Sequence, residues 1–296
     1  MVVFIREDKM KEILVCPLWR RPEFLMVWID LIKKVDNPEG IFFIFCLDYS
    51  YDIKNEEILD KYFPFPYGVI KTPDQRFKLG KQSFNVLNGL MCAMNHTEGL
   101  VYYLEEDVFP GRDFFNWHRR VHEKELDIFC SIATRNNNTK YETQDNPDYY
   151  YISKKPDYQA LGSCFKSGIL REFIQPHFMR EYFKDPVGYC TRVFPDSFIG
   201  KFYVEQDGLI RRIIEKCKKP IAFPHYPRAY HAGFYGYNRK SKIQMPSFDT
   251  KVRFILENAF DNEKMRRVSL NEHYYQDSMP IDLEVRSDKS VNYNII

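Results

Sequence analysis

The stretch LVYYLEEDVFPGRDFF, residues 100–115, decides how the fold is interpreted. An apolar run ends in three consecutive carboxylates, Glu105, Glu106 and Asp107, and apolar residues with a proline and a glycine follow at once. The run is typical of a strand that is buried on both faces. Three like charges are hydrated on an open turn, whereas in a cleft they require a cation. These residues alone leave both interpretations open.

The sequence before this stretch alternates strand-like and helix-like segments. Strands are expected at 12–18, 40–48, 67–72 and 100–107, and helices at 21–35, 55–63 and 79–95. This alternation predicts an α/β fold with a mostly parallel central sheet flanked by helices. Ligands of such sheets bind beyond the carboxyl ends of the strands. We therefore expect Arg20, Arg21 and Asp48 to share one rim of the sheet with the three carboxylates.

The sequence after this stretch is less regular. Helices are expected at 114–126, 167–175, 178–185 and 204–217, and strands at 127–133 and 159–165. Residues 134–158 are polar, tyrosine-rich and without a period, which predicts a functional or flexible loop. Beyond about residue 240 the chain is basic and irregular. We expect a first half at 1–133, a second half of the same domain at 134–240 and a basic extension at 241–296.

Composition excludes several classes of protein. The 296 residues are 44% hydrophobic and 17% aromatic, which excludes a disordered chain. The formal charge of +2 argues neither for nor against a nucleic-acid or other anionic partner. The seven cysteines form no CxxC pair, and no segment approaches the roughly 18 apolar residues of a membrane span. These features predict a cytoplasmic protein with buried thiols and no membrane span, and they leave its oligomeric state open.

The three carboxylates, if they lie in a cleft, suit a hard divalent cation. Mg²⁺ or Mn²⁺ prefers oxygen ligands, and with one or two carboxylates it keeps positions open for substrate phosphates. A nucleoside diphosphate bridged by such an ion has the charge of its leaving group neutralised.

Several motifs together carry a resemblance to a known family. They are ILVCPLWRRPEFLMVWIDLI, FIFCLDYSYD, YYLEEDVFPGRDFF, VEQDGLIRR and PHYPRAYHAG, which spread over residues 12–236. In this combination the sequence resembles the GT-A nucleotide-sugar glycosyltransferases, and its later motifs are similar to the N-acetylglucosaminyltransferase I branch. The resemblance implies a Rossmann-like sheet with an acceptor-side region toward the C-terminus. It also implies an Mn²⁺ or Mg²⁺ ion and a nucleotide-sugar donor, with UDP-sugars favoured.

The same resemblance implies roles for the residues of the first half. Asp107 stands at the position of the direct metal ligand, and Glu105 and Glu106 stand near the ribose and the sugar of the donor. Asp48 matches the aspartate that contacts the nucleoside. Arg20 and Arg21 follow the first strand and could reach the pyrophosphate or the base, although Arg21 could equally mark a helix start.

Inverting transfer requires a general base for the acceptor hydroxyl, and the metal carboxylate cannot supply it. Our candidate is Asp207 at a helix start, with Glu205 as the substitute. A helix N-terminus lowers the pKa of a carboxylate and keeps it ionised. The alternative is a charge that only offsets the helix dipole. Arg228 is a candidate cation for the diphosphate, and His231 is either a further metal ligand or a structural histidine.

The acceptor and two other classes of function stay open at this point. The acceptor is a glycan or, for a virus- or phage-encoded enzyme, a hydroxymethylated DNA base. The basic runs HRRVH, IRRIIEKCKK and NRKSK could instead belong to a nucleic-acid-binding module, although such runs usually face water. A sugar nucleotidyltransferase shares the layout but usually has a glycine-rich phosphate loop near its N-terminus.

Overall fold

The central strand of the sheet is buried on both faces, as its sequence predicts. The chain is described by a computed structural model over residues 10–19, 21–47, 53–71, 81–134, 150–225, 227–232, 250–251 and 255. In β1 (Met10–Leu18), Leu14 and Cys16 belong to the core on one face, and Ile13 and Val15 belong to the core on the other. Because side chains alternate along a strand, an unbroken apolar run serves two cores at once.

Eight strands form one mixed sheet in the order β3-β2-β1-β4-β8-β6-β9-β7. Besides β1 they are β2 (Ile41–Leu47), β3 (Tyr67–Lys71), β4 (Thr97–Tyr103), β6 (Cys130–Ile132), β7 (Tyr150–Ser153), β8 (Ser163–Lys166) and β9 (Ile221–Pro224). The pairs β1–β2, β1–β4, β2–β3 and β6–β9 are parallel, and the other three pairs are antiparallel. The prediction of an α/β fold with a mostly parallel sheet is confirmed.

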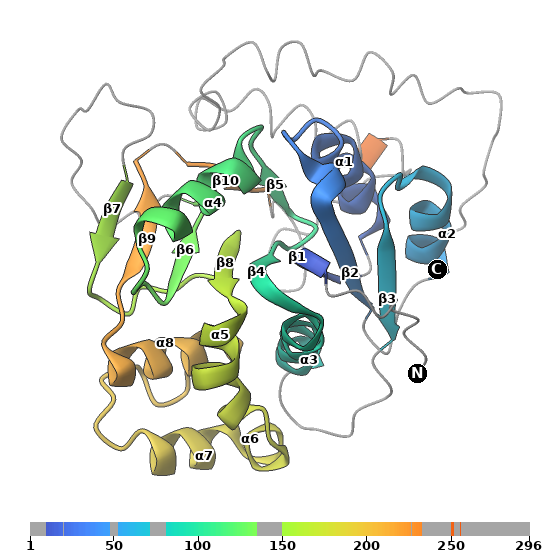
Figure 1. Ribbon diagram of the computed structural model, residues 1–296. Helices are drawn as coiled ribbons and strands as arrows, with labels where there is room; N and C mark the ends of the chain where they lie inside the picture. Colours follow the sequence, from blue (N-terminus) through green and yellow to red (C-terminus); the bar gives the residue numbers. More distant parts are fainter. Residues whose placement is uncertain are drawn as a thin grey trace.

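Helices cover both faces of this sheet (Figure 1). They are α1 (Pro22–Ile32), α2 (Ile53–Tyr62), α3 (Lys81–His96), α4 (Phe114–Lys124), α5 (Ser167–Ile169), α6 (Arg180–Lys184), α7 (Pro186–Val193) and α8 (Gln206–Cys217), with 3₁₀ turns at Pro38–Gly40 and Gln175–His177. Residues of α1, α2 and α4 join the core that contains Leu14, and residues of α3, α6, α7 and α8 join the core that contains Ile13. No helix in these ranges is long and apolar enough to cross a membrane.

Several predicted boundaries are wrong, mostly in the second half. The strand expected at 100–107 ends at Tyr103, and the carboxylates lie in the turn after it. The segment 134–158 contains β7, which pairs with β9; its residues 135–149 lie outside the described residues. The helix expected at 167–175 is α5 followed by a π turn at Leu170–Ile174. Short elements like these carry too few residues for a period to be read.

A buried histidine pair fastens α4 to the sheet. His118 Nδ1 lies 2.6 Å from Ser131 Oγ on β6, and the same hydroxyl lies 3.0 Å from His122 Nε2. His122 Nε2 also lies 3.1 Å from the carbonyl of Cys164 on β8. Burial, reinforced by the neighbouring His122, lowers the pKa of His118, and burial lowers the pKa of His122 from 6.5 to about 4. Both rings are therefore neutral at pH 7.

These histidines make the fold sensitive to acid. The unfolded chain binds protons on both rings below about pH 6.5, whereas the folded chain binds them only at lower pH. Stability is therefore full above pH 6.5 and falls as the pH drops toward 4. For His122 alone the loss is about 3 kcal/mol. Urea unfolding between pH 4 and 7.5 measures it. His122→Gln should flatten this dependence, whereas His96→Gln, at the end of α3, should not.

Candidate active site

The three carboxylates lie in a tight turn, here called the acidic turn, between two paired strands. Leu104 still donates its N–H to the carbonyl of Val15 on β1, and Val108 N–H then closes the turn on the carbonyl of Glu105 at 3.0 Å. Strand β5 (Val108–Pro110) follows and pairs antiparallel with β10 (Ala229–His231), which places Val108 opposite His231. The acidic turn is thus held at the carboxyl rim by the sheet on one side and by this two-stranded ribbon on the other.

Arg21 lies against the acidic turn, as the rim rule predicts. Its Nε and Nη2 donate to Glu106 Oε1 at 3.0 and 2.8 Å, and its Nη1 donates to Asp107 Oδ2 at 2.7 Å. The backbone N–H of Trp19 donates to the same Glu106 oxygen at 3.2 Å. Since Arg21 is the residue before Pro22, the first residue of α1, the helix start fixes where the guanidinium is presented.

Asp107 is the most strongly ionised group of the acidic turn. Burial alone would raise its pKa, but His231, whose Nε2 lies 3.5 Å from Asp107 Oδ2, and the Arg21 guanidinium together outweigh burial. They hold the pKa of Asp107 at about 2. The second oxygen, Oδ1, is buried and has no hydrogen-bond partner among the described residues. Such an oxygen is costly unless a donor or a cation reaches it.

Glu105 and Glu106 are held in a different state. Burial raises the pKa of Glu106, although Arg21 acts against it. Burial and the charge of Asp107 raise the pKa of Glu105 well above its usual value, while the Tyr103 hydroxyl, which donates to Glu105 Oε1 at 2.5 Å, acts in the opposite direction. The surroundings of Glu105 and Glu106 therefore favour their protonated forms, and an added cation would favour the ionised forms instead.

These observations fit a divalent cation at Asp107. The orphaned Oδ1 and the nearby His231 offer two protein ligands, and an ion with few protein ligands keeps positions for phosphates. Within the described ranges, no group of three or more acidic, histidine or cysteine side chains is arranged to hold a metal ion. A diphosphate would have to complete the coordination.

Asp207 is presented by the first turn of α8. Ser83 of α3 anchors this turn, because its hydroxyl donates to Gln206 Oε1 at 2.7 Å and accepts from Gln206 N–H at 3.1 Å. Glu205 lies just before the helix and is exposed. Asp207 Oδ1 is buried with no partner in the part of the chain that the structure describes.

The expectation that the helix start lowers the pKa of Asp207 is wrong. Burial raises that pKa to about 6, and Glu205 adds to the rise, while Arg211 and a backbone hydrogen bond at Ala160 oppose it. The helix dipole is a small effect at an exposed end, and here desolvation exceeds it. A carboxylate with a pKa near 6 is a stronger base than an ordinary aspartate and is still mostly ionised at pH 7.

A rigid loop lies next to Asp207. The guanidinium of Arg212 is 3% exposed and donates to the carbonyls of Ile199, Gly200, Tyr203 and Gly208 at 2.5–3.2 Å. Gly208 has to be glycine, since a Cβ there would lie 2.0 Å from the carbonyl oxygen of Tyr203. The segment 199–203 is thereby fixed against the start of α8, with Phe198 and Phe202 exposed.

Asp207 and the acidic turn are a hundred residues apart in the sequence, yet they lie close enough in the fold for their charges to interact. Asp207 is one of the charges that raise the pKa of Glu105, after burial, Asp107 and Glu106. It also raises the pKa values of Tyr103 and Tyr158, in which burial is the largest cause. Tyr103 is not among the sequence candidates, and Tyr158 is the last residue of the tyrosine-rich segment 134–158. Tyr158 is buried, and its carbonyl accepts from Arg211 Nε at 2.8 Å.

Arg228 is not brought to the acidic turn. Its side chain is completely buried, and its Nε lies 3.2 Å from Asp113 Oδ2, next to the start of α4. Its backbone N–H donates to Ala133 O, and its carbonyl accepts from Gly111 N–H. This geometry supports a structural role in holding β10 against β5, not contact with a diphosphate. The remaining candidates, Arg20 and Asp48, lie outside the described residues.

Comparison with known proteins gives distant structural similarity only. No protein-family model and no curated protein sequence matches the chain. S. aureus TarS has 10% identity and a TM-score of 0.46 over 91% of this chain, which spans 42% of that chain. TarS 1–349 in complex with UDP-GlcNAc has 12% identity and a TM-score of 0.47, covering 94% of this chain and 77% of that one.

A third solved structure is similar to the same extent. The mannosyltransferase PcManGT from Pyrobaculum calidifontis, in complex with GDP-Man and Mn²⁺, has 10% identity and a TM-score of 0.44, covering 94% of this chain and 77% of that one. Similarity at this level assigns neither an activity nor a substrate, so both must be argued from the chain's own residues.

Proposed function

We propose that this protein is a metal-dependent, inverting glycosyltransferase of the GT-A type. It would move a sugar from a nucleoside-diphosphate donor to an acceptor hydroxyl. The observation that carries the proposal is the convergence of the acidic turn with Asp207. The acidic turn suits a cation and a diphosphate, and Asp207 suits a base that accepts a proton. The sequence analysis names the same two groups.

Donor binding is assigned to the acidic turn. Asp107, with its orphaned Oδ1, and His231 would hold the cation, and the diphosphate would complete its coordination. The bound cation neutralises the charge that develops on the departing diphosphate. Glu105, hydrogen-bonded to Tyr103, and Glu106, fixed by Arg21, would face the ribose and the sugar.

Asp207 is assigned the role of general base. In the transfer, the bond between the anomeric carbon and the diphosphate oxygen breaks, and the acceptor oxygen forms a new bond to that carbon. Asp207 takes the hydroxyl proton. A pKa of about 6 matches a base that works near neutral pH. Inversion follows if the base and the diphosphate act on opposite faces of the sugar, as their separate elements, α8 and the turn after β4, allow.

Donor binding without an acceptor tests this proposal. The chain is heated with UDP-, GDP- and TDP-sugars, each with Mn²⁺ or with a chelator. One donor should raise the melting temperature only with the metal. At a hundredfold excess over its Kd the gain is about 2.7 kcal/mol. Release of the nucleoside diphosphate by slow hydrolysis should show the same preference. Indifference to every donor in both conditions would refute the proposal.

A further inference from the structure

Arg21 is a cation built into the acidic turn. Its three hydrogen bonds of 2.7–3.0 Å reach two different carboxylates, and its side chain is 15% exposed. The backbone holds it in place: its N–H donates to Trp19 O, and its carbonyl accepts from the N–H groups of Phe24 and Leu25. The guanidinium also lies over the Phe24 ring, 5.0 Å from its centre. The position is therefore determined by the start of α1.

The charges of the turn show what this cation does. Glu106 and Asp107 carry two negative charges, and Arg21 cancels one of them. Glu105 is hydrogen-bonded to Tyr103 instead. For Arg21, Glu106 and Asp107 taken by themselves, a divalent ion at Asp107 would change the sum from one net negative charge to one net positive charge in a largely buried place. A bound diphosphate would bring the sum back below zero.

We propose that Arg21 is a resident counter-ion that weakens the binding of free divalent cations to Asp107, so that the metal is retained only together with a diphosphate. This inference rests on the proposed function. Arg21 takes Oδ2 of Asp107 and leaves Oδ1 for the metal, so the two cations share one carboxylate and repel each other. The acidic turn is thereby stable without metal, and the metal arrives with the donor.

Removing the charge of Arg21 tests the inference with the metal alone. Arg21→Gln keeps amide donors but no charge, and it should bind Mn²⁺ about tenfold tighter or more than the wild type, the effect expected for one charge at this range. Titration calorimetry without nucleotide measures the Kd. Arg21→Lys keeps the charge and should bind Mn²⁺ as weakly as the wild type does. Adding Asp107→Asn to Arg21→Gln should abolish the gain in affinity for Mn²⁺.

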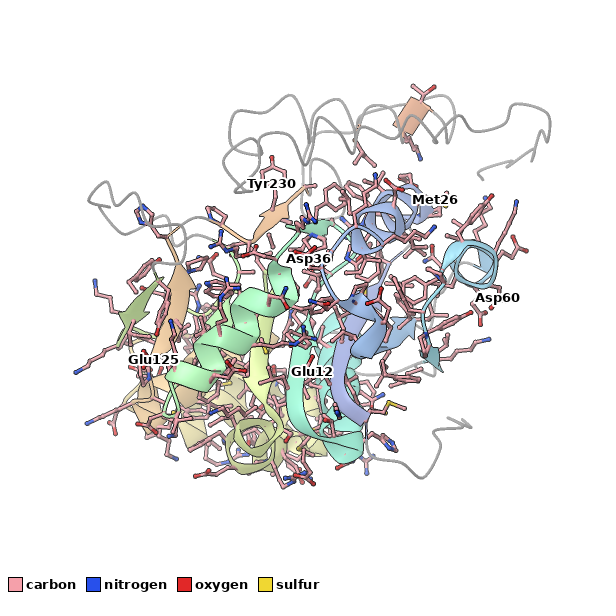
Figure 2. All side chains as sticks on the ribbon, turned by 45° about the horizontal axis from the view of Figure 1, so that its top comes forward. Glu12, Met26, Asp36, Asp60, Glu125 and Tyr230 are labelled. Atoms are coloured by element: carbon pink, nitrogen blue, oxygen red, sulfur yellow. The ribbon has the colours of Figure 1, made fainter. Side chains whose placement is uncertain are left out.

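Arg119 provides a matched control. It forms a comparable ion pair with Glu12 at 2.6–3.0 Å, with side-chain exposures of 25% and 17%. Figure 2 shows Glu12, a residue of β1, well away from Tyr230, which lies on β10, the strand that pairs with β5 just after the acidic turn. Arg119→Gln should leave the Kd for Mn²⁺ unchanged. If Arg21→Gln binds Mn²⁺ no tighter than the wild type, or if Arg119→Gln gains equally, the inference is wrong.

Two further measurements keep this test decisive. If Arg21→Gln folds only with Mn²⁺ present, its melting temperature should collapse on chelation while that of the wild type does not, which supports the inference. The wild type is also titrated with Mn²⁺ and the nucleotide sugars together. If the wild type binds a nucleotide sugar together with Mn²⁺ but Arg21→Gln binds Mn²⁺ alone no tighter than the wild type, the proposed function stands and the counter-ion role fails. If the wild type ignores every donor while Arg21→Gln gains, the proposed function fails and the counter-ion role stands.

Discussion

Replacing Asp207 with asparagine is expected to lower turnover by about 10²–10⁴-fold, the range that a positioned general base contributes. Asparagine has almost the same shape as aspartate but cannot accept the acceptor's proton. Since the proposed role of Asp207 is toward the acceptor hydroxyl, the Kd of the donor should stay within about twofold, so the loss falls on kcat. Single-turnover transfer and donor titration on the same samples measure both. Unchanged turnover would remove Asp207 from the mechanism.

The pH dependence gives a second readout of the same residue. The pKa of Asp207 is about 6, and the base acts in its ionised form. Turnover of the wild type should therefore rise as the pH increases through about 6 and then level off. The residual activity of Asp207→Asn should lack this rise. A structural role for Asp207 would lower the activity equally at every pH.

Glu205 decides between the two candidate bases. It is exposed and lies two residues before Asp207. Glu205→Gln should retain most of the turnover and the rise near pH 6, shifted slightly downward because Glu205 raises the pKa of Asp207. If Glu205→Gln loses activity and Asp207→Asn keeps it, the roles are reversed.

Replacing Asp107 with asparagine is expected to abolish the response to metal and to reduce turnover by about 10³-fold or more. A metal supplies several kcal/mol of stabilisation to the developing charge, and 1.4 kcal/mol corresponds to tenfold in rate. In contrast to Asp207→Asn, this change should also remove the thermal stabilisation by donor plus Mn²⁺. Thermal melts with and without both ligands measure it.

The surface carboxylate Asp127 is a suitable control for that experiment. Its side chain is 86% exposed and pairs with Lys219. Asp127→Asn should preserve the metal response and the turnover. Full metal-dependent stabilisation of Asp107→Asn would show that the cation binds elsewhere.

The sequence predicts the first half of the fold well, because its strands are long and buried on both faces. The apolar runs around Val15 and Ile44 leave no alternative to central strands. Because the carboxyl ends of parallel strands share one rim of the sheet, Arg21 is then expected near the acidic turn. A strand is predicted at 159–165 and β8 is found at Ser163–Lys166, but its antiparallel place between β4 and β6 could not be foreseen, since no local signal shows which distant strands a four-residue strand joins.

The pKa values and the burial of the site residues were harder to predict from the sequence than the identity of those residues. Asp207 is a candidate because of its place at a helix start, yet its pKa depends mainly on burial. Arg228 was chosen for its charge, and only its complete burial beside Asp113 separates it from the donor site. Burial is a property of the packed chain and has no signature within a short motif.

The shared sheet has a mechanical consequence. Strand β4, which leads to the acidic turn, is hydrogen-bonded to β8, whose chain continues toward Asp207. The backbone hydrogen bonds between β4 and β8 join the donor side of the sheet to the part of the chain that leads to the base. The spacing between the acidic turn and the chain that leads to Asp207 is therefore set by the sheet itself.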